Sequence, residues 1–238
     1  MSRRQLSASL VIAMATLTVL TGCSGAADEP EPRFVTTEES QLLAIARFNN
    51  FDAGTRAVTA TLTDQGHDLS LTGWMDYRTG AGYVSLTVDD SPNSLLLWET
   101  HTLAAHAPIE PIPLPAPDTN DGLGDTWTTG PIDPTVSNLH TVLILITELG
   151  LDRPENPLLL QQGGVLWLGT DIVGDTAVTI FSGPTGLDGD GESRLRYWVD
   201  DTGIMHRAEI LLGTEWATVT FGDDEDVSLP YSVGPLTE

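Results

Sequence analysis

An alternation of apolar and polar residues with a period of two recurs along most of this chain and constrains its fold more than any other feature. In residues 55–63, Val58, Ala60 and Leu62 alternate with threonines, and residues 69–72 repeat the pattern after a Gln-Gly turn. Such alternation places apolar side chains on one face of a strand and polar side chains on the other. Short turn sequences separate the segments, which predicts an antiparallel sheet of about nine strands. The other strand segments are residues 84–88, 94–102, 165–173, 176–182, 194–199, 204–212 and 216–221.

Two further segments have the apolar spacing of an amphipathic helix. The first follows Thr36, which can cap a helix while Glu39 returns a hydrogen bond from the third position, and its apolar stripe ends at residue 48. The second covers residues 133–150 and is apolar on more than one side, so we expect it to be buried. The order helix, four strands, helix, five strands predicts an α+β fold with two main helices.

The N-terminus has the layout of a secretory signal. Arg3 and Arg4 precede an apolar stretch at residues 10–20, and small residues precede Cys23, the only cysteine. The ending Leu-Thr-Gly-Cys resembles the lipobox of bacterial lipoproteins, which implies removal of residues 1–22, diacylation of the Cys23 thiol, for example with palmitate, and retention on the outer face of the cell membrane. An ordinary signal peptide that ends in cysteine and a transmembrane anchor are the alternatives. A lone thiol in an exported protein has no disulfide partner, and the apolar stretch is short for a spanning helix, which needs about 20 residues.

The sequence after the signal divides into a tether and one domain. Residues 23–36 contain little apolar material, and we expect an acylated flexible tether there, followed by a single domain at residues 37–238. The chain has 34 acidic residues against ten basic ones, all arginine, and a formal net charge of −24. Such a surface repels nucleic-acid phosphates, so DNA and RNA are not expected partners.

No sequence motif supports catalysis or a cofactor. The chain has no GxSxG elbow, no phosphate-binding glycine loop and no zinc spacing among its histidines. We therefore predict a protein that is not an enzyme and carries no cofactor or catalytic metal. Asp188, Asp190 and Glu192 alternate with glycines and could ligate calcium, although acidic hairpin loops are common in so acidic a chain. The proline-rich residues 107–117 predict an extended loop, either a lid or a surface excursion.

Several stretches behind the lipobox together resemble a known family. They are the strands at residues 55–82, which run into Gly-Trp-Met-Asp-Tyr at 73–77, the mid-chain helix, and Tyr-Trp-Val-Asp at 197–200 followed by residues 203–207. This order is similar to the LolA-like fold of lipoprotein carriers and of LppX- and LprG-type lipoproteins. The resemblance implies a strongly curved antiparallel sheet, an open half-barrel, with helices on its concave side. It also implies binding of acyl chains or lipidated molecules without catalysis.

The leading hypothesis is therefore a membrane-anchored lipoprotein that binds or carries a hydrophobic ligand. A curved sheet with an apolar concave face must fill with its own helices or hold an apolar guest, and a fully packed core is the alternative. A protein–protein interaction or envelope-sensing module on the outer face of the membrane is the competing function. The candidate ligand residues are Val58, Leu62, Leu71, Leu86, Leu143, Ile146, Ile180 and Tyr197.

Overall fold

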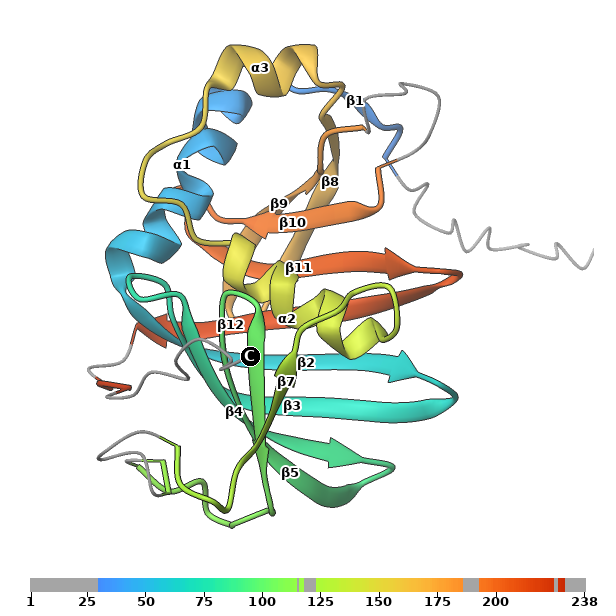
Figure 1. Cartoon of the computed structure of the whole chain (residues 1–238). Helices are drawn as coiled ribbons and strands as arrows, with labels where there is room; N and C mark the ends of the chain where they lie inside the picture. The colour runs from blue at the N-terminus through green and yellow to red at the C-terminus, as the bar shows by residue number, and fades with distance from the viewer. Residues whose placement is uncertain (1–29, 115, 118–122, 186–192, 225–226, 230–238) are drawn as a thin grey trace, which may run out of the picture.

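Twelve strands form one antiparallel sheet, and three helices lie on one side of it (Figure 1). The computed structural model describes residues 30–114, 116–117, 123–185, 193–224 and 227–229. The helices are α1 (Thr37–Ala53), α2 (Asn138–Glu148) and α3 (Pro157–Gln162). The strands are β1 (Arg33–Phe34), β2 (Thr55–Asp64), β3 (His67–Asp76), β4 (Ala81–Val88), β5 (Ser91–Glu99), β6 (Thr102–His106), β7 (Thr128–Pro131), β8 (Leu166–Val173), β9 (Thr176–Ser182), β10 (Leu195–Val199), β11 (Met205–Leu212) and β12 (Glu215–Asp224).

The sheet is curved and open, with the order β1-β8-β9-β10-β11-β12-β2-β3-β4-β5-β6-β7. The last strand, β12, pairs with β2 and so joins two consecutive meanders into one surface. The predicted α+β class and antiparallel pairing are confirmed, but the number of strands is twelve rather than about nine. One added strand comes from the predicted segment 94–102, which is divided by a turn at Thr100, where φ is +45°. The other two added strands, β1 and β7, are only two and four residues long.

Helix α1 begins as predicted and ends later than predicted. The Thr36 hydroxyl accepts a hydrogen bond from the Glu39 amide at 3.2 Å, and Glu39 Oε2 accepts from the Thr36 amide at 2.8 Å. The helix continues through Asn49 and Asn50 because the side chain of Asn50 is buried and both its amide nitrogen and its amide oxygen are hydrogen-bonded. Its Nδ2 donates to the Leu149 carbonyl at 2.8 Å, and its Oδ1 accepts from Arg56 at 2.6 Å. A tertiary contact therefore overrides a residue type that ends most helices.

Helix α2 begins five residues later than the predicted start at residue 133. Asp133 accepts hydrogen bonds from both the amide and the hydroxyl of Thr135 and so closes a turn. Ser137 then caps α2 by accepting from the His140 amide. Helix α3 is not among the helices predicted from the sequence, and it begins with Asn156 as cap and Pro157 in the first turn.

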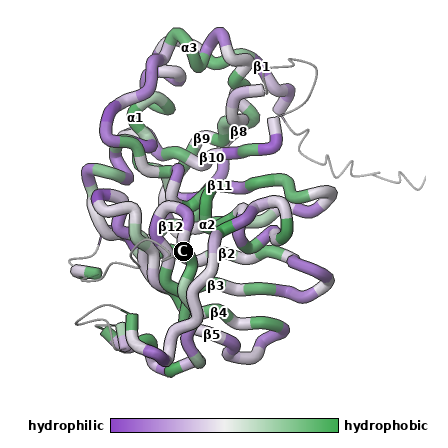
Figure 2. Tube along the Cα trace, viewed as in Figure 1, coloured by the Kyte–Doolittle hydropathy of each residue, from purple (hydrophilic) through white to green (hydrophobic). Residues whose placement is uncertain are grey.

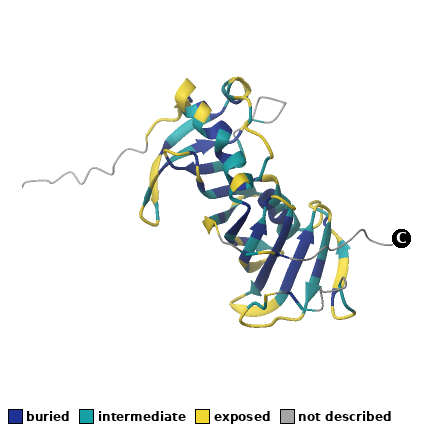
Figure 3. Cartoon of the chain, turned by 90° about the vertical axis from the view of Figure 1, so that its left-hand side faces the viewer, coloured by how far each residue is buried: buried dark blue, intermediate teal, exposed yellow. Residues whose placement is uncertain are grey.

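The main core lies between the helices and one face of the sheet, which we call the concave face. Figure 3 shows buried residues following the strands through the interior. Leu43 and Ala46 of α1 and Leu143 and Ile146 of α2 are buried in the same cluster as the alternating apolar positions of β2 and β3. The predicted division of these strands into an apolar and a polar face is confirmed in the middle of β2, where Val58, Ala60 and Leu62 are buried and Thr59, Thr61 and Thr63 are not.

A second, smaller core lies on the opposite, outer face of β3–β6. The proline-rich segment crosses this face, where Tyr83 Oη donates to the Pro113 carbonyl at 3.1 Å and Trp127 Nε1 donates to the Pro117 carbonyl at 2.9 Å. Ala116 and Leu229 are buried in the same cluster. The segment is thus a loop, as predicted, but it packs on the outer face and does not act as a lid over the concave face.

The N-terminal boundary of the domain lies earlier than residue 37. Arg33 and Phe34, placed in the tether by the sequence, pair as β1 with β8 at the sheet edge, and Val35 is buried. No helix within the described ranges is long and apolar enough to cross a membrane. Cys23 and the acidic residues 188–192 lie outside the described residues.

Candidate functional site

The middle of the concave face is filled by the protein's own side chains. Six of the eight candidate ligand residues are packed there, with exposures of 6% or less. The mouth of the half-barrel is therefore largely plugged by α2 and by the strands themselves, and these six positions belong to the packed core rather than to an open cavity. They are Val58, Leu62, Leu71, Leu86, Leu143 and Ile146.

Ile180 lies on the other side of the sheet. It is the register partner of Trp198 on β10, whereas its neighbour Phe181 pairs with Tyr197 and belongs to the main core. Ile180 and Trp198 line a hollow on the outer face together with Pro30. The placement of Ile180 on the concave face was therefore wrong, because the period of two in β9 has the opposite phase from the one the sequence suggested.

A pocket of about 210 Å³ does remain on the concave side, between α1, α3 and the strands β10 and β11. Its walls are mainly apolar, and Tyr197, the eighth candidate residue, is one of them. Burial raises the pKa of Tyr197 to about 12, so its phenol is neutral at physiological pH and offers one hydroxyl to an otherwise apolar space. The apolar wall residues are Leu43, Leu160, Pro184, Leu195 and Met205.

An arginine and a glutamate line one side of this pocket. Arg47 Nη1 lies 3.2 Å from Glu155 Oε1, and Arg47 Nε donates to the Glu148 carbonyl at 2.9 Å. The Glu148 carbonyl is one of the last of α2, and a cation there interacts favourably with the helix dipole. The chain after α2 is also fixed to α1 by the Glu155 amide, which donates to the Ala44 carbonyl at 2.8 Å. The side chain of Arg47 is thus held in place at the edge of the pocket, where its charge is paired with that of Glu155.

Helix α3 covers this pocket from the end of the molecule. Leu160 is its only buried residue, and it points toward the pocket, while Leu158 and Leu159 are 62% and 63% exposed. Gln161 Nε2 donates to Ser40 Oγ of α1 at 3.2 Å. One buried leucine and a few hydrogen bonds hold the cover, which makes α3 an element of low local stability.

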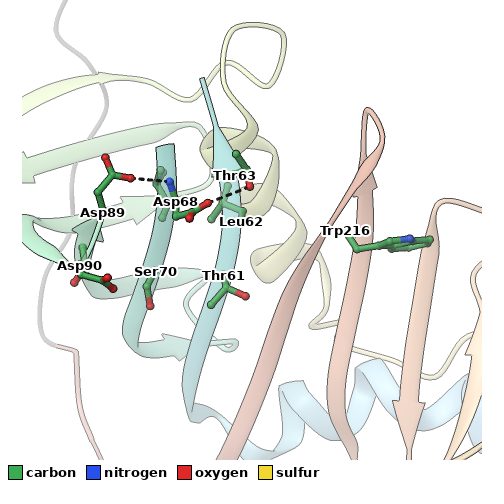
Figure 4. A pocket seen from close by; sticks show the side chains of 10 residues that line it. Thr61, Leu62, Thr63, Asp68, Ser70, Asp89, Asp90 and Trp216 are labelled. Atoms are coloured by element: carbon green, nitrogen blue, oxygen red, sulfur yellow. Dashed lines mark hydrogen bonds between the residues drawn. The ribbon is translucent and has the colours of Figure 1, made fainter. Parts of the chain in front are cut away.

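A larger hollow of about 590 Å³ is an open groove on the outer face, drawn in Figure 4. Threonines of β2, Ser70, and Asp89 and Asp90 line it, with Trp216 to one side. Asp89 Oδ2 lies 2.7 Å from His67 Nδ1, and its Oδ1 accepts from the Asp68 amide at 3.0 Å. The contact with His67 lowers the pKa of Asp89. The groove is lined mainly by polar and acidic side chains, so it does not suit an apolar ligand.

A partly buried aspartate–histidine pair, Asp200 and His206, belongs to a network that stabilises a turn. Asp200 Oδ2 lies 2.9 Å from His206 Nε2, and Asp200 Oδ1 accepts from the amides of Thr202 and Ile204. The hydroxyl of Thr202 also donates to Asp200, at 2.7 Å. In an activated nucleophile the hydroxyl would instead donate to the histidine, which would act as its base. Among the residues that the structure describes, no group of three or more histidine, aspartate or glutamate side chains is arranged to hold a metal ion.

The comparison with known proteins gives likenesses of fold only. No protein-family model matches the chain, and no curated protein matches it. The lipoprotein LppX of Mycobacterium tuberculosis is 15% identical over 80% of this chain and 98% of its own, with a TM-score of 0.45. LprF of Mycobacterium bovis is 15% identical over 85% of this chain and 100% of its own, with a TM-score of 0.43. A LolA superfamily protein of Nitrosomonas europaea is 12% identical over 79% of this chain and 92% of its own, with a TM-score of 0.24.

These structures include both kinds of protein that the sequence resembles, LppX-type lipoproteins and the LolA superfamily. With every TM-score below 0.5, the likenesses are loose, and the roles of residues in this chain have to come from its own geometry.

Proposed function

We propose that this protein binds a hydrophobic ligand, without catalysis, in the pocket between α1, α3 and β10–β11. The observation that carries the proposal is the composition of that pocket, with four leucine or methionine side chains and a proline against one neutral phenol and one fixed ion pair. Apolar walls favour an apolar guest through the area removed from water, while Arg47 and Tyr197 provide polar groups at one side that would orient a carboxyl or ester head group.

The volume of the pocket limits the mode of binding. Ligand pockets usually measure about 300–1,000 Å³, and this one measures about 210 Å³. The pocket therefore takes the end of an acyl chain, or it widens when α3 moves outward. Leu160 is the side chain that such a movement would withdraw from the pocket.

The pocket is tested with a fluorescent fatty acid and the variant Leu195→Trp. The larger indole would occupy the space, and the affinity should fall by about tenfold or more. Leu212→Trp is the matched control, because Leu212 is another partly buried leucine packed against the core but not lining the pocket. Equal affinities for wild type and Leu195→Trp, with melting temperatures unchanged, would contradict the proposal.

The same proposal includes export and anchoring through an acylated Cys23 on the outer face of the cell membrane. It is supported by the lipobox-like sequence before Cys23 and by the domain beginning close behind it, at β1. Fractionation of cells that express wild type or Cys23→Ser tests the anchor, and a variant that still carries acyl groups and stays with membranes would contradict it.

A further inference from the structure

Three large apolar side chains are exposed at the end of the molecule where the described chain begins. Phe34 of β1 is 72% exposed, and Leu158 and Leu159 of α3 are 62% and 63% exposed. Figures 1 and 3 both place β1 and α3 at this end, with the proline-rich loop at the other. Gln161 of α3 contacts Thr37 and Ser40 at the start of α1, three to six residues after Phe34. We call Phe34, Leu158 and Leu159 the tether-end patch.

The exposure of these side chains is unfavourable in water and needs a reason. Helix α3 has three leucines in succession, of which only Leu160 is used in the core, and Figure 2 shows a green, hydrophobic stretch in α3 beside a purple, hydrophilic one. The fold does not require an apolar residue at position 158 or 159, because neither side chain is buried. Exposed apolar groups that gather in one region mark an interaction surface more often than isolated ones do.

The length of chain before β1 identifies what lies near this end. Cys23 precedes Phe34 by eleven residues, and eleven residues reach at most about 40 Å when fully extended. An acyl group on Cys23 therefore keeps the tether-end patch close to the bilayer, on the side from which a lipid ligand would arrive.

We infer that the tether-end patch is a membrane-contact surface that inserts into the interfacial layer of the bilayer and places α3, the cover of the pocket, against lipid. The inference rests on the proposed function, since it assumes the acylated anchor and a ligand that enters under α3. Insertion of apolar side chains adds a second contact to the lipid anchor and fixes which face of the domain meets the bilayer. The chain has a net charge of −24 and is repelled by anionic head groups, so we infer contact with zwitterionic lipids.

The contact is tested with the acylated full chain in phosphatidylcholine vesicles. Because the only native thiol is that of Cys23 and acylation blocks it, a thiol introduced by Leu159→Cys can be labelled alone with a fluorophore. Brominated lipids should quench this fluorophore. The matched control is Val136→Cys, since Val136 is equally exposed at 62% but lies before α2, and its fluorophore should not be quenched. Equal quenching at the two positions, or none at 159, would overturn the inference.

A second measurement separates this surface from the pocket. Transfer of a fluorescent fatty acid from vesicles to the double variant Leu158→Gln/Leu159→Gln should slow by about tenfold, while the affinity for the same ligand added from solution stays unchanged. Val136→Gln should alter neither. A wild-type protein that does not bind the ligand at all would refute the proposed function, whereas normal binding with unchanged transfer in the double variant would refute only the membrane contact. Leu159→Cys chains that form disulfide-linked dimers on vesicles, without lipid quenching, would assign the patch to a second copy and overturn the inference.

Discussion

Arg56 is a buried cation whose replacement should measurably destabilise the fold. It is 4% exposed, and its guanidinium donates four hydrogen bonds to uncharged oxygens. Two go to the Gly222 carbonyl of β12 at 3.1 and 2.7 Å, one to the Met205 carbonyl of β11 at 2.9 Å, and one to Asn50 Oδ1 of α1 at 2.6 Å. Burial lowers the pKa of Arg56 from its ordinary value. One side chain on β2 therefore joins α1 to two other strands at the point where the two meanders meet.

The expected loss of stability follows from the hydrogen-bond acceptors that Arg56→Met would leave without a donor. Asn50 Oδ1 and the Met205 carbonyl are in buried bonds, and each unsatisfied buried acceptor costs about 1–3 kcal/mol. The part-buried Gly222 carbonyl adds a smaller cost, and removal of a buried charge offsets part of the total. We expect a loss of about 3 kcal/mol, a large part of the total stability of an ordinary domain, which is about 5–15 kcal/mol.

The assay is equilibrium unfolding in urea, followed by tryptophan fluorescence and analysed by linear extrapolation. Arg78→Met is the control, because Arg78 is an exposed arginine that donates to the Asp52 carbonyl near the end of α1, the helix that Arg56 also contacts. It should lose less than about 1 kcal/mol. The reasoning would be refuted if Arg56→Met lost no more unfolding free energy than Arg78→Met, with the same slope of that free energy against urea concentration. The three acceptors would then not depend on Arg56.

Two further predictions concern the turn at Asp200 and the close packing at Gly82. Burial would raise the pKa of Asp200, but hydrogen bonds from His206 and Thr202 and from nearby amides outweigh it and hold the pKa below its ordinary value. The ionised Asp200 thus stabilises the fold above the ordinary carboxyl pKa, and this contribution is lost as pH falls through the lowered one. Asp200→Asn should flatten the fall of melting temperature between neutral pH and about pH 3, and an identical pH profile would count against it. Gly82→Ala would place a Cβ 2.1 Å from the buried Trp98 ring and should cost about 1–3 kcal/mol in urea unfolding. Gly130→Ala, which meets open space, should cost almost nothing, and equal effects would refute the packing argument.

The local structure followed from patterns that extend over only a few residues. The alternation in β2 predicted which side chains enter the core, and Thr36 with Glu39 predicted the start of α1 through a capping box. Glycines and turn residues located the strands after residue 165, whose bounds agree with the structure to within a few residues. Each of these features depends on backbone geometry and on burial of one face, and both repeat within a few residues of sequence.

The candidate site was predicted less well, because it depends on contacts between distant segments. The sequence identified apolar positions on the concave face, but most of these side chains are packed in the core with α2. Of the eight candidate ligand residues, only Tyr197 lines the remaining pocket. The pocket exists because Leu160 of α3 approaches Leu43 of α1 across more than a hundred residues of chain.

The sequence by itself determined an antiparallel sheet, the division of β2 into an apolar and a polar face, and the first helix cap, and it predicts lipid attachment at Cys23. Only the tertiary structure decided that the proline-rich loop covers the outer face, that α1 continues through Asn50, and that Ile180 faces outward. The reason is physical: periodicity assigns residues to faces within one element, whereas which element covers a face is set by the packing of the whole chain, where shape and buried hydrogen-bond partners are matched over long distances.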